Sequence, residues 1–298
     1  MNRRIEVSVV LPFRNARATI ISSIRSILMQ TFEAFELVAV DDASTDGSLG
    51  LVRSLADPRI KILVNDRNLG LAGSLNRGID AASARYIARM DADDLSYPAR
   101  LEMQYECLEE HRNVDVLGTS ALMFSGGGEC VGVLPSTADH AGICRSGRLG
   151  SFPLYHPTWM GKAAWFRGHH YDESFRKAQD FELLLRAASV STYANLEEVL
   201  VGYRYSPHSS LRKRLETRRY TWLAMRKNFA ATHDLPALIG GGVMTGAKAL
   251  RDLLISLRIP GVGSSTTRIA DATPGQVKRW REVWREFQGQ EVTWTMAT

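Results

Sequence analysis

The chain has 298 residues, 45% of them hydrophobic, so it is long and apolar enough to bury a full core and is not expected to be disordered. Its net charge of +5 is uneven, because residues 1–200 hold 21 Lys/Arg against 25 Asp/Glu, whereas residues 201–298 hold 16 against 7. The three cysteines, Cys107, Cys130 and Cys144, have spacings that match neither a zinc site nor a disulfide framework.

In the first hundred residues, apolar runs rich in β-formers alternate with stretches of helical spacing. Strands are predicted over Val7–Leu11, Glu36–Val40, Ile60–Val64 and Tyr86–Met90, with helical stripes between them at residues 20–28, 51–55 and 71–82. Strands that alternate with helices of this length imply right-handed crossovers and a mostly parallel sheet. The sequence therefore predicts an α/β fold with helices on both faces of the sheet.

The pattern changes after residue 97. A helix is predicted from Pro98, in its first turn, to Leu108, and then a strand at 114–124, a turn at 126–128 and a return strand at 130–134, which together imply a mixed second half of the sheet. Residues 137–160 are predicted to be rich in loops. A helix over 180–188, a strand over 200–205 and a basic helix over 211–229 follow.

Two further stretches raise the question of membrane contact. Charged residues interrupt the apolar stretch 235–259, and the run Gly240–Gly242 weakens a helix there, so a bilayer-spanning helix is not predicted. Residues 277–287 form an amphipathic basic helix with an aromatic stripe. This form suits a membrane interface, although packing of the stripe onto the rest of the chain, or onto a second subunit in a homodimer, is favoured.

An acidic cluster follows the fourth predicted strand. Asp91, Asp93 and Asp94 come directly after the buried run Tyr86–Ala88, and like charges this close repel unless a cation or strong donors neutralise them. A solvated acidic turn is the alternative. The position at the carboxyl end of a strand favours a ligand site, with Mg²⁺ or Mn²⁺ shared with a phosphate-bearing substrate.

Several motifs in register resemble the family 2 glycosyltransferases, which have the GT-A fold. The resemblance covers roughly residues 5–210 and is carried by Val9–Asn15, Val40–Asp46, Asn68–Ala72, Arg89–Asp94, His156–Thr158 and Lys177–Arg186. It implies a catalytic domain over 1–210, with a nucleotide-binding half at about 1–100 and an acceptor half at about 101–210. A basic helical extension then occupies 211–298.

The resemblance assigns a nucleotide pocket to the loops after the first three strands. Asp42, together with Asp41, would receive the uracil of a UDP-sugar, since a carboxylate can accept the imide N–H of that base. Pro12 and Asn15 would shape the floor of the pocket, and Asn68 and Gly70 would turn near the ribose or diphosphate. For Asp42 the structural alternative is a turn or helix cap.

The same resemblance places the metal and the chemistry. Asp91, Asp93 and Asp94 match the family's DXD motif, in which Asp91 and Asp93 contact the donor and Asp93 or Asp94 holds the metal, with His208 as a further candidate ligand. Asp180 is the candidate general base, and its alternative is a helix cap. His156 and Gln179 are expected to face the acceptor, and Gln179 stands where Glu is common in the family.

Arg186 has two interpretations. It could face the donor diphosphate, or it could pair with Glu182 one helical turn away, as surface residues at this spacing often do.

These assignments predict an inverting, metal-dependent glycosyltransferase. It would move a sugar from UDP to a hydroxyl of a surface polysaccharide, or of a glycan linked to polyprenyl phosphate. The basic C-terminal helices predict peripheral membrane contact, and the chain shows no nucleic-acid motif. The apolar run Val7–Leu11 is too short for a signal peptide core, so we expect a cytoplasmic protein, at the inner face of the plasma membrane.

Two other functions remain open from the sequence. A sugar-phosphate nucleotidylyltransferase would need a Gly-rich phosphate loop after the first strand, where this chain has Pro12–Asn15. A non-catalytic scaffold that keeps the glycosyltransferase fold would be expected to have lost some of the four carboxylates Asp42, Asp93, Asp94 and Asp180, which are all present.

Overall fold

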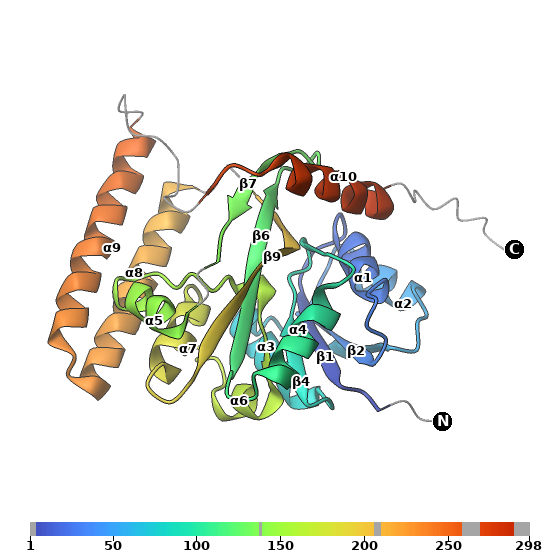
Figure 1. The fold of residues 1–298 in the computed structure, drawn as a ribbon, viewed down its shortest axis with the longest axis horizontal. Coiled ribbons are helices and arrows are strands. Elements are labelled where there is room, and N and C mark those ends of the chain that lie inside the picture. Colours follow the sequence, from blue (N-terminus) through green and yellow to red (C-terminus); the bar gives the residue numbers. More distant parts are fainter. Residues whose placement is uncertain (1–3, 137–138, 206–209, 258–268, 289–298) are drawn as a thin grey trace, which may run out of the picture.

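A nine-stranded mixed sheet forms the centre of the computed structural model, which describes residues 4–136, 139–205, 210–257 and 269–288 (Figure 1). The strand order is β3-β2-β1-β4-β8-β6-β9-β5, and β7 pairs with β6 outside this path. The strands are β1 (Val7–Phe13), β2 (Phe35–Asp41), β3 (Ile60–Val64), β4 (Tyr86–Arg89), β5 (Leu95–Ser96), β6 (Val116–Phe124), β7 (Cys130–Leu134), β8 (Met160–Lys162) and β9 (Tyr193–Arg204).

Helices cover both faces of the sheet, as predicted. They are α1 (Ile20–Leu28), α2 (Ser48–Ser54), α3 (Gly70–Ala81), α4 (Arg100–Glu110), α5 (His140–Arg148), α6 (Ala163–Gly168), α7 (Gln179–Ala187), α8 (Leu211–Thr232), α9 (Leu235–Ser256) and α10 (Pro274–Gln288). Because successive side chains of a strand point to opposite faces, Val9 and Leu11 pack with α1 and α4, whereas Val10 packs with α3. Pro98 lies just before α4, not in its first turn.

The first four strands confirm the parallel prediction, and the second half of the sheet is mixed as expected. The prediction for residues 137–160 was only partly right. This stretch contains helix α5, and β8 begins at its end and enters the sheet antiparallel between β4 and β6. A three-residue strand is too short to show a periodicity, so nothing in the sequence announced it.

Helices α8 and α9 form an antiparallel hairpin beside the sheet (Figure 1). Helix α9 runs through Gly240–Gly242, although this run was expected to weaken a helix. Close packing explains the difference, because a Cβ on Gly241 would lie 2.2 Å from Cε of Met225 on α8. Within the described part of the chain, no helix is long and apolar enough to cross a membrane.

Helix α10 lies across the end of the sheet and buries its aromatic stripe there (Figure 1). Trp280 is 1% exposed, its indole N–H donates to the carbonyl of Gly128 at 2.8 Å, and its ring lies 4.7 Å from that of Phe124. The prediction that this stripe packs onto the rest of the chain is confirmed. The aromatic residues of α10 are therefore not available as membrane anchors.

Candidate active site

The loops after β1 and β2 are tied to each other at the carboxyl edge of the sheet. The backbone N–H of Asn15 donates to Oγ of Ser44 at 3.0 Å, and Oδ1 of Asn15 accepts from the backbone N–H of Thr45 at 2.8 Å. Pro12 lies inside β1, opposite Val40 of β2. Pro12 and Asn15 thus shape this edge, where the resemblance placed the floor of the nucleotide pocket.

Asp42 fastens the loop that follows β3. Its Oδ1 accepts from the side chain of Asn65 at 2.9 Å and from the backbone N–H of Leu69 at 2.7 Å, and its Oδ2 accepts from Gly70 at 3.0 Å. Asn68 closes the same turn, because its Oδ1 also accepts from Gly70, whose φ of +76° suits glycine. Asp42 therefore stabilises the turn before α3, which is the structural role given above as its alternative. These three hydrogen bonds leave about one of its four acceptor positions free.

Asp41 and Asp42 are both nearly buried, at 1% and 5% exposed. Oδ1 of Asp41 accepts from the backbone N–H of Ser44 at 3.2 Å. The acidic pair after β2 thus holds two loops, one through each carboxylate.

Asp91, Asp93 and Asp94 form a cluster in which one ligand oxygen from each residue lies within 4.8 Å of the others. Asp94 is buried, and its Oδ1 accepts from the backbone N–H of Arg204 at 2.8 Å. Its Oδ2 is buried without a partner among the described residues. Burial, reinforced by the charges of its two neighbours, raises the pKa of Asp94 well above its usual range, and burial and Asp91 raise that of Asp93.

This cluster fits a divalent cation. Hard carboxylate oxygens are the donors that Mg²⁺ and Mn²⁺ prefer. A buried carboxylate oxygen with no donor costs free energy, and a bound cation would remove that cost. The unpartnered Oδ2 of Asp94 is therefore the feature of this site that most favours a metal.

Arg89 lies buried beneath the cluster. Its Nη2 donates to Oδ1 of Asp91 at 2.5 Å, while Nε and Nη1 have no partner among the described residues. Its positive charge also acts on Asp180, whose pKa it lowers. Arg89 thus links the acidic cluster after β4 to the start of α7, two regions 86 residues or more apart in the chain.

Asp180 stands in the first turn of α7, half-buried and within electrostatic reach of Arg89 and Asp91. Burial raises the pKa of Asp180, and the charge of Asp91 adds to this, while the backbone N–H of Phe181 and the charge of Arg89 oppose it. The charges of Arg89 and Asp91 therefore act on Asp180, and its role as the base stays a prediction.

His156 lies under the same region. It is 8% exposed, its Nε2 is 2.7 Å from the hydroxyl of Tyr171, and its ring meets Trp159 edge-on. Burial and the nearby charge of Arg89 hold the pKa of His156 well below its usual value, so the ring stays neutral. Gln179, also 8% exposed, precedes Asp180 at the start of α7.

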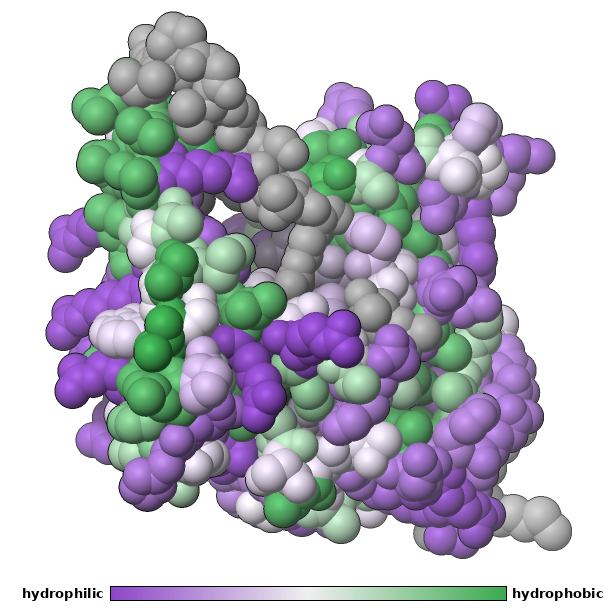
Figure 2. Space-filling view, turned by 60° about the vertical axis from the view of Figure 1, so that its left-hand side comes forward, coloured by the Kyte–Doolittle hydropathy of each residue, from purple (hydrophilic) through white to green (hydrophobic). Residues whose placement is uncertain are grey.

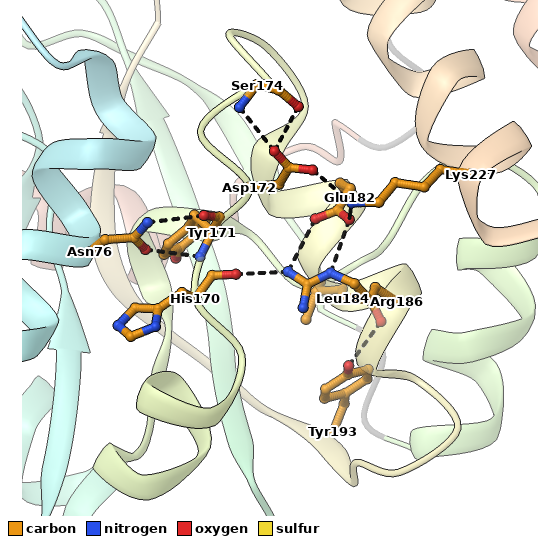
Figure 3. Close-up of polar contacts among 10 residues, drawn as sticks. All are labelled: Asn76, His170, Tyr171, Asp172, Ser174, Glu182, Leu184, Arg186, Tyr193 and Lys227. Atoms are coloured by element: carbon orange, nitrogen blue, oxygen red, sulfur yellow. Dashed lines mark hydrogen bonds and ion pairs between the residues drawn. The ribbon is translucent and has the colours of Figure 1, made fainter. Parts of the chain in front are cut away.

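A polar network fixes α7 in place (Figure 3). Buried Glu182 accepts from Arg186 at 2.9 Å and from Lys227 of α8 at 2.7 Å, and Lys227 also donates to Asp172 at 2.6 Å. Arg186 is thus the i to i+4 partner of Glu182, the second of the two alternatives. Asn76 of α3 holds the backbone of Tyr171 through both of its side-chain ends.

Backbone strain gathers at the site. Five described non-glycine residues have a positive φ, which L side chains rarely adopt. Three of them, Asn15, Ala43 and Ala178, at +51°, +57° and +55°, lie at or next to residues predicted for the site, and Ala56 and His233 lie elsewhere. Ala43 follows Asp42, and Ala178 stands two residues before Asp180. Such strain persists only where the surroundings enforce it, and it is concentrated at functional sites.

The sequence did not single out three residues of this site. Arg89 was visible beside the acidic cluster, but its burial was not. Arg204 donates from its backbone N–H to Asp94 and from Nε to the carbonyl of Asp93 at 2.9 Å, and nothing in the sequence pairs it with residues 110 positions away. No motif or pattern in the sequence marked Tyr171 as a residue of the site. His208 lies outside the described residues.

Comparison with known proteins finds one family model and many relatives. The model described as Glycosyl transferase family 2 matches residues 8–164. EpsE of Bacillus subtilis, named as a glycosyltransferase, is 39% identical over 212 residues, which are 68% of this chain and 74% of EpsE. WfgD of Escherichia coli, a UDP-Glc:α-D-GlcNAc-diphosphoundecaprenol β-1,3-glucosyltransferase, is 43% identical over 98 residues, which are 33% of this chain and 39% of WfgD.

A solved structure extends the likeness to the fold. TarS of S. aureus in complex with UDP-GlcNAc superposes with a TM-score of 0.62 at 19% identity, over 95% of this chain and 80% of the other. The GT-A fold with helices after the catalytic region is thereby confirmed.

Proposed function

The chain belongs to glycosyl transferase family 2 and is a glycosyltransferase, and from its site we propose that it moves a sugar from UDP to a hydroxyl of a lipid-linked or polysaccharide glycan. The observation that carries the proposal is that buried Arg89 binds Asp91 of the acidic cluster and also acts through its charge on Asp180. A metal-binding group and a base on one site are what sugar transfer from a nucleoside diphosphate requires.

The donor would lie over the carboxyl edge of β1, β2 and β4. Asp42 has one free acceptor position, which suits the imide N–H of uracil, and its neighbour Asp41 lines the same edge. The turn at Asn68 and Gly70 would run beside the ribose or diphosphate. Relatives support a UDP donor, since WfgD is named for UDP-Glc.

The metal would be held by Asp93 and Asp94, with Asp91 turned toward the donor sugar. A divalent ion bound there would neutralise the charge that develops on the departing nucleoside diphosphate. Arg89 holds Asp91 in place from below through its Nη2. His208 is a further candidate for this role.

Asp180 would take the proton of the acceptor hydroxyl as that oxygen attacks the sugar carbon from the face opposite the diphosphate, which inverts the configuration. Burial raises the pKa of Asp180, which makes it a stronger base, while the N–H of Phe181 and the charge of Arg89 favour the ionised carboxylate that this step needs. Gln179 and the neutral ring of His156, both nearly buried, are the candidates for contact with the acceptor.

The name of a relative and the charge of the chain both support the proposed acceptor class. WfgD is named for a glycan on diphosphoundecaprenol, which is a membrane lipid. The basic C-terminal third of this chain suits the anionic surface in which such an acceptor lies, at the cytoplasmic face of the plasma membrane.

A donor panel tests the proposal. The full chain is mixed with UDP-, GDP- and dTDP-sugars in the presence of Mn²⁺, and the melting temperature and nucleotide release are measured. We expect UDP-sugars to raise the melting temperature by mass action, and EDTA to abolish turnover. Asp94→Asn should lower turnover on the order of 10²–10³-fold.

The matched control is Asp80→Asn, an exposed aspartate on α3 whose side chain pairs only with His170 among the described residues. This variant should keep full turnover. Nucleotide release that is unchanged by EDTA, or a preference for GDP-sugars over UDP-sugars, would contradict the proposal.

A further inference from the structure

Helix α9 exposes one continuous apolar face to solvent, and Figure 2 shows hydrophobic side chains gathered along this side of the molecule. Ile239, Val243 and Leu250 are 58%, 67% and 58% exposed. The spacing of four and seven residues puts them on one side of a helix about 33 Å long. No exposed residue of α9 is charged; the large apolar ones on or next to it are Leu235, Ile239, Val243, Met244, Leu250, Leu253 and Leu257.

The opposite face of α9 packs against the rest of the protein. Gly241, Thr245 and Asp252 are buried, and Asp252 pairs with Arg214 and Arg218 of α8. Packing and ion pairs thus hold α9 against α8. The apolar face of α9 is therefore exposed in the folded protein. A large apolar face left exposed in this way is typical of sites that contact a membrane or another protein.

The neighbouring helix supplies positive charge. Helices α8 and α9 together carry nine Lys/Arg against two Asp/Glu, and Arg212, Lys213, Arg219 and Arg226 of α8 are exposed. Two copies of this hairpin packed face to face would bring these like charges together. An anionic lipid surface would be attracted by them instead, and that argues for a membrane over a second subunit.

The hairpin that carries the apolar face is connected to the region of the candidate site. Helix α8 begins seven residues after Arg204, which contacts Asp93 and Asp94. Asp252, near the end of α9, lies beside the first half of α8. Lys227, in the second half of α8, contacts Glu182, two residues after Asp180, so the hairpin lies beside the helix that carries the candidate base.

We propose that the exposed face of α9 docks the protein on an anionic bilayer, with the basic residues of α8 contacting lipid headgroups. The docking surface is not α10, whose aromatic stripe is buried against the sheet. This inference does not rest on the donor or the metal, because lipid binding can be measured without either.

Vesicle flotation tests the apolar half of the proposal. The full chain is mixed with vesicles of phosphatidylcholine alone, or of phosphatidylcholine with phosphatidylglycerol at about 3:1. We expect at least tenfold stronger binding to the anionic vesicles. Ile239→Ser, Val243→Ser and Leu250→Ser combined should lower that binding at least tenfold, since all three side chains would leave the lipid.

The matched control for the apolar variant is Val190→Ser, at a 72% exposed valine after α7. This variant should bind vesicles like the unchanged chain. Equal binding of the unchanged chain and the α9 triple variant would overturn the proposal. A dimer of the unchanged chain in sedimentation, lost in the triple variant, would also overturn it, because a second copy would then cover the face.

The charge half has its own pair of variants. Arg219→Gln with Arg226→Gln should weaken binding to anionic vesicles by roughly fivefold per charge, and added salt should reduce the difference. Arg53→Gln with Arg112→Gln, on exposed arginines of α2 and of the turn after α4, should change binding little. Equal effects of the two pairs would mean that net charge alone drives binding, and would overturn the proposal.

A variant that strengthens binding tests the same face, because a misfolded variant would not be expected to bind vesicles more tightly. Val243→Trp places an interfacial aromatic residue on the exposed face and should strengthen binding to anionic vesicles several-fold. Unchanged or weaker binding of this variant would count against α9 as the lipid contact.

Discussion

At the scale of single residues, the site depends on one buried cation among several carboxylates. Arg89 holds Asp91 directly and acts on Asp180 through its charge. The motifs in the sequence pointed to both the acidic cluster and Asp180, and their roles stay predictions. The burial of Arg89 was not, since it depends on α7 and on the 154–171 region folding over β4, and no local pattern encodes that contact.

Asp180→Asn tests the base. Asparagine keeps the size of the side chain but cannot take the proton of the acceptor, so we expect kcat for sugar transfer to fall about 10²–10⁴-fold, while the melting temperature shift with a UDP-sugar stays the same. Glu173→Gln, an exposed carboxylate a few residues earlier, should leave kcat unchanged. Loss of donor binding in Asp180→Asn would show that Asp180 holds the donor and is not the base.

At the scale of elements, periodicity predicted the long pieces and missed the short ones. The first four strands and helices α1, α3 and α7 lie within a few residues of the predicted ranges. Strand β8 was missed because three residues show no pattern, although it joins the parallel and mixed halves of the sheet. The Gly240–Gly242 run suggested weakness because propensity is local, whereas the contact of Gly241 with Met225 is tertiary.

The joint between α7 and α8 should weaken in acid. Burial opposes the shift, but hydrogen bonds from Lys227 and Ser174 lower the pKa of Asp172 to about 2. A lowered pKa gives stability that is complete above the unfolded value of about 3.9 and is lost as the pH falls toward 2. We expect Lys227→Met to cost about 1–2 kcal/mol at pH 7, and clearly less near pH 3.

Denaturant unfolding at the two pH values measures this difference. The control is Arg226→Met, the exposed neighbour of Lys227 on the same helix, which should cost little at either pH. An equal loss at pH 7 and pH 3 for Lys227→Met would show that the ion pairs do not contribute and that the variant acts through packing.

At the scale of the whole molecule, the last described helix closes the sheet. The spacing of residues predicted the aromatic stripe of α10. The sequence alone did not decide whether the stripe contacts a membrane, a second subunit or the rest of the chain. In the structure the indole of Trp280 packs on Gly202 of β9. A Cβ at that position would lie 2.3 Å from the ring of Trp280, so this packing requires glycine. The division into a catalytic domain over 1–210 and an extension over 211–298 stays a prediction.

Trp280→Ala tests this closure. Loss of the buried indole and its hydrogen bond to Gly128 should lower the free energy of unfolding by roughly 3–5 kcal/mol. Lys278→Ala, exposed on the same helix, should change it by less than about 0.5 kcal/mol. A small effect of Trp280→Ala in denaturant unfolding would mean that α10 unfolds separately from the sheet.

The loops at the proposed donor site are already joined to one another by Asn15, Ser44 and Asp42. A nucleotide arriving there meets a surface whose backbone entropy was lost when the chain folded, so little ordering accompanies binding. The association rate of the donor at this edge would then be limited by diffusion and orientation, because these loops do not need to rearrange.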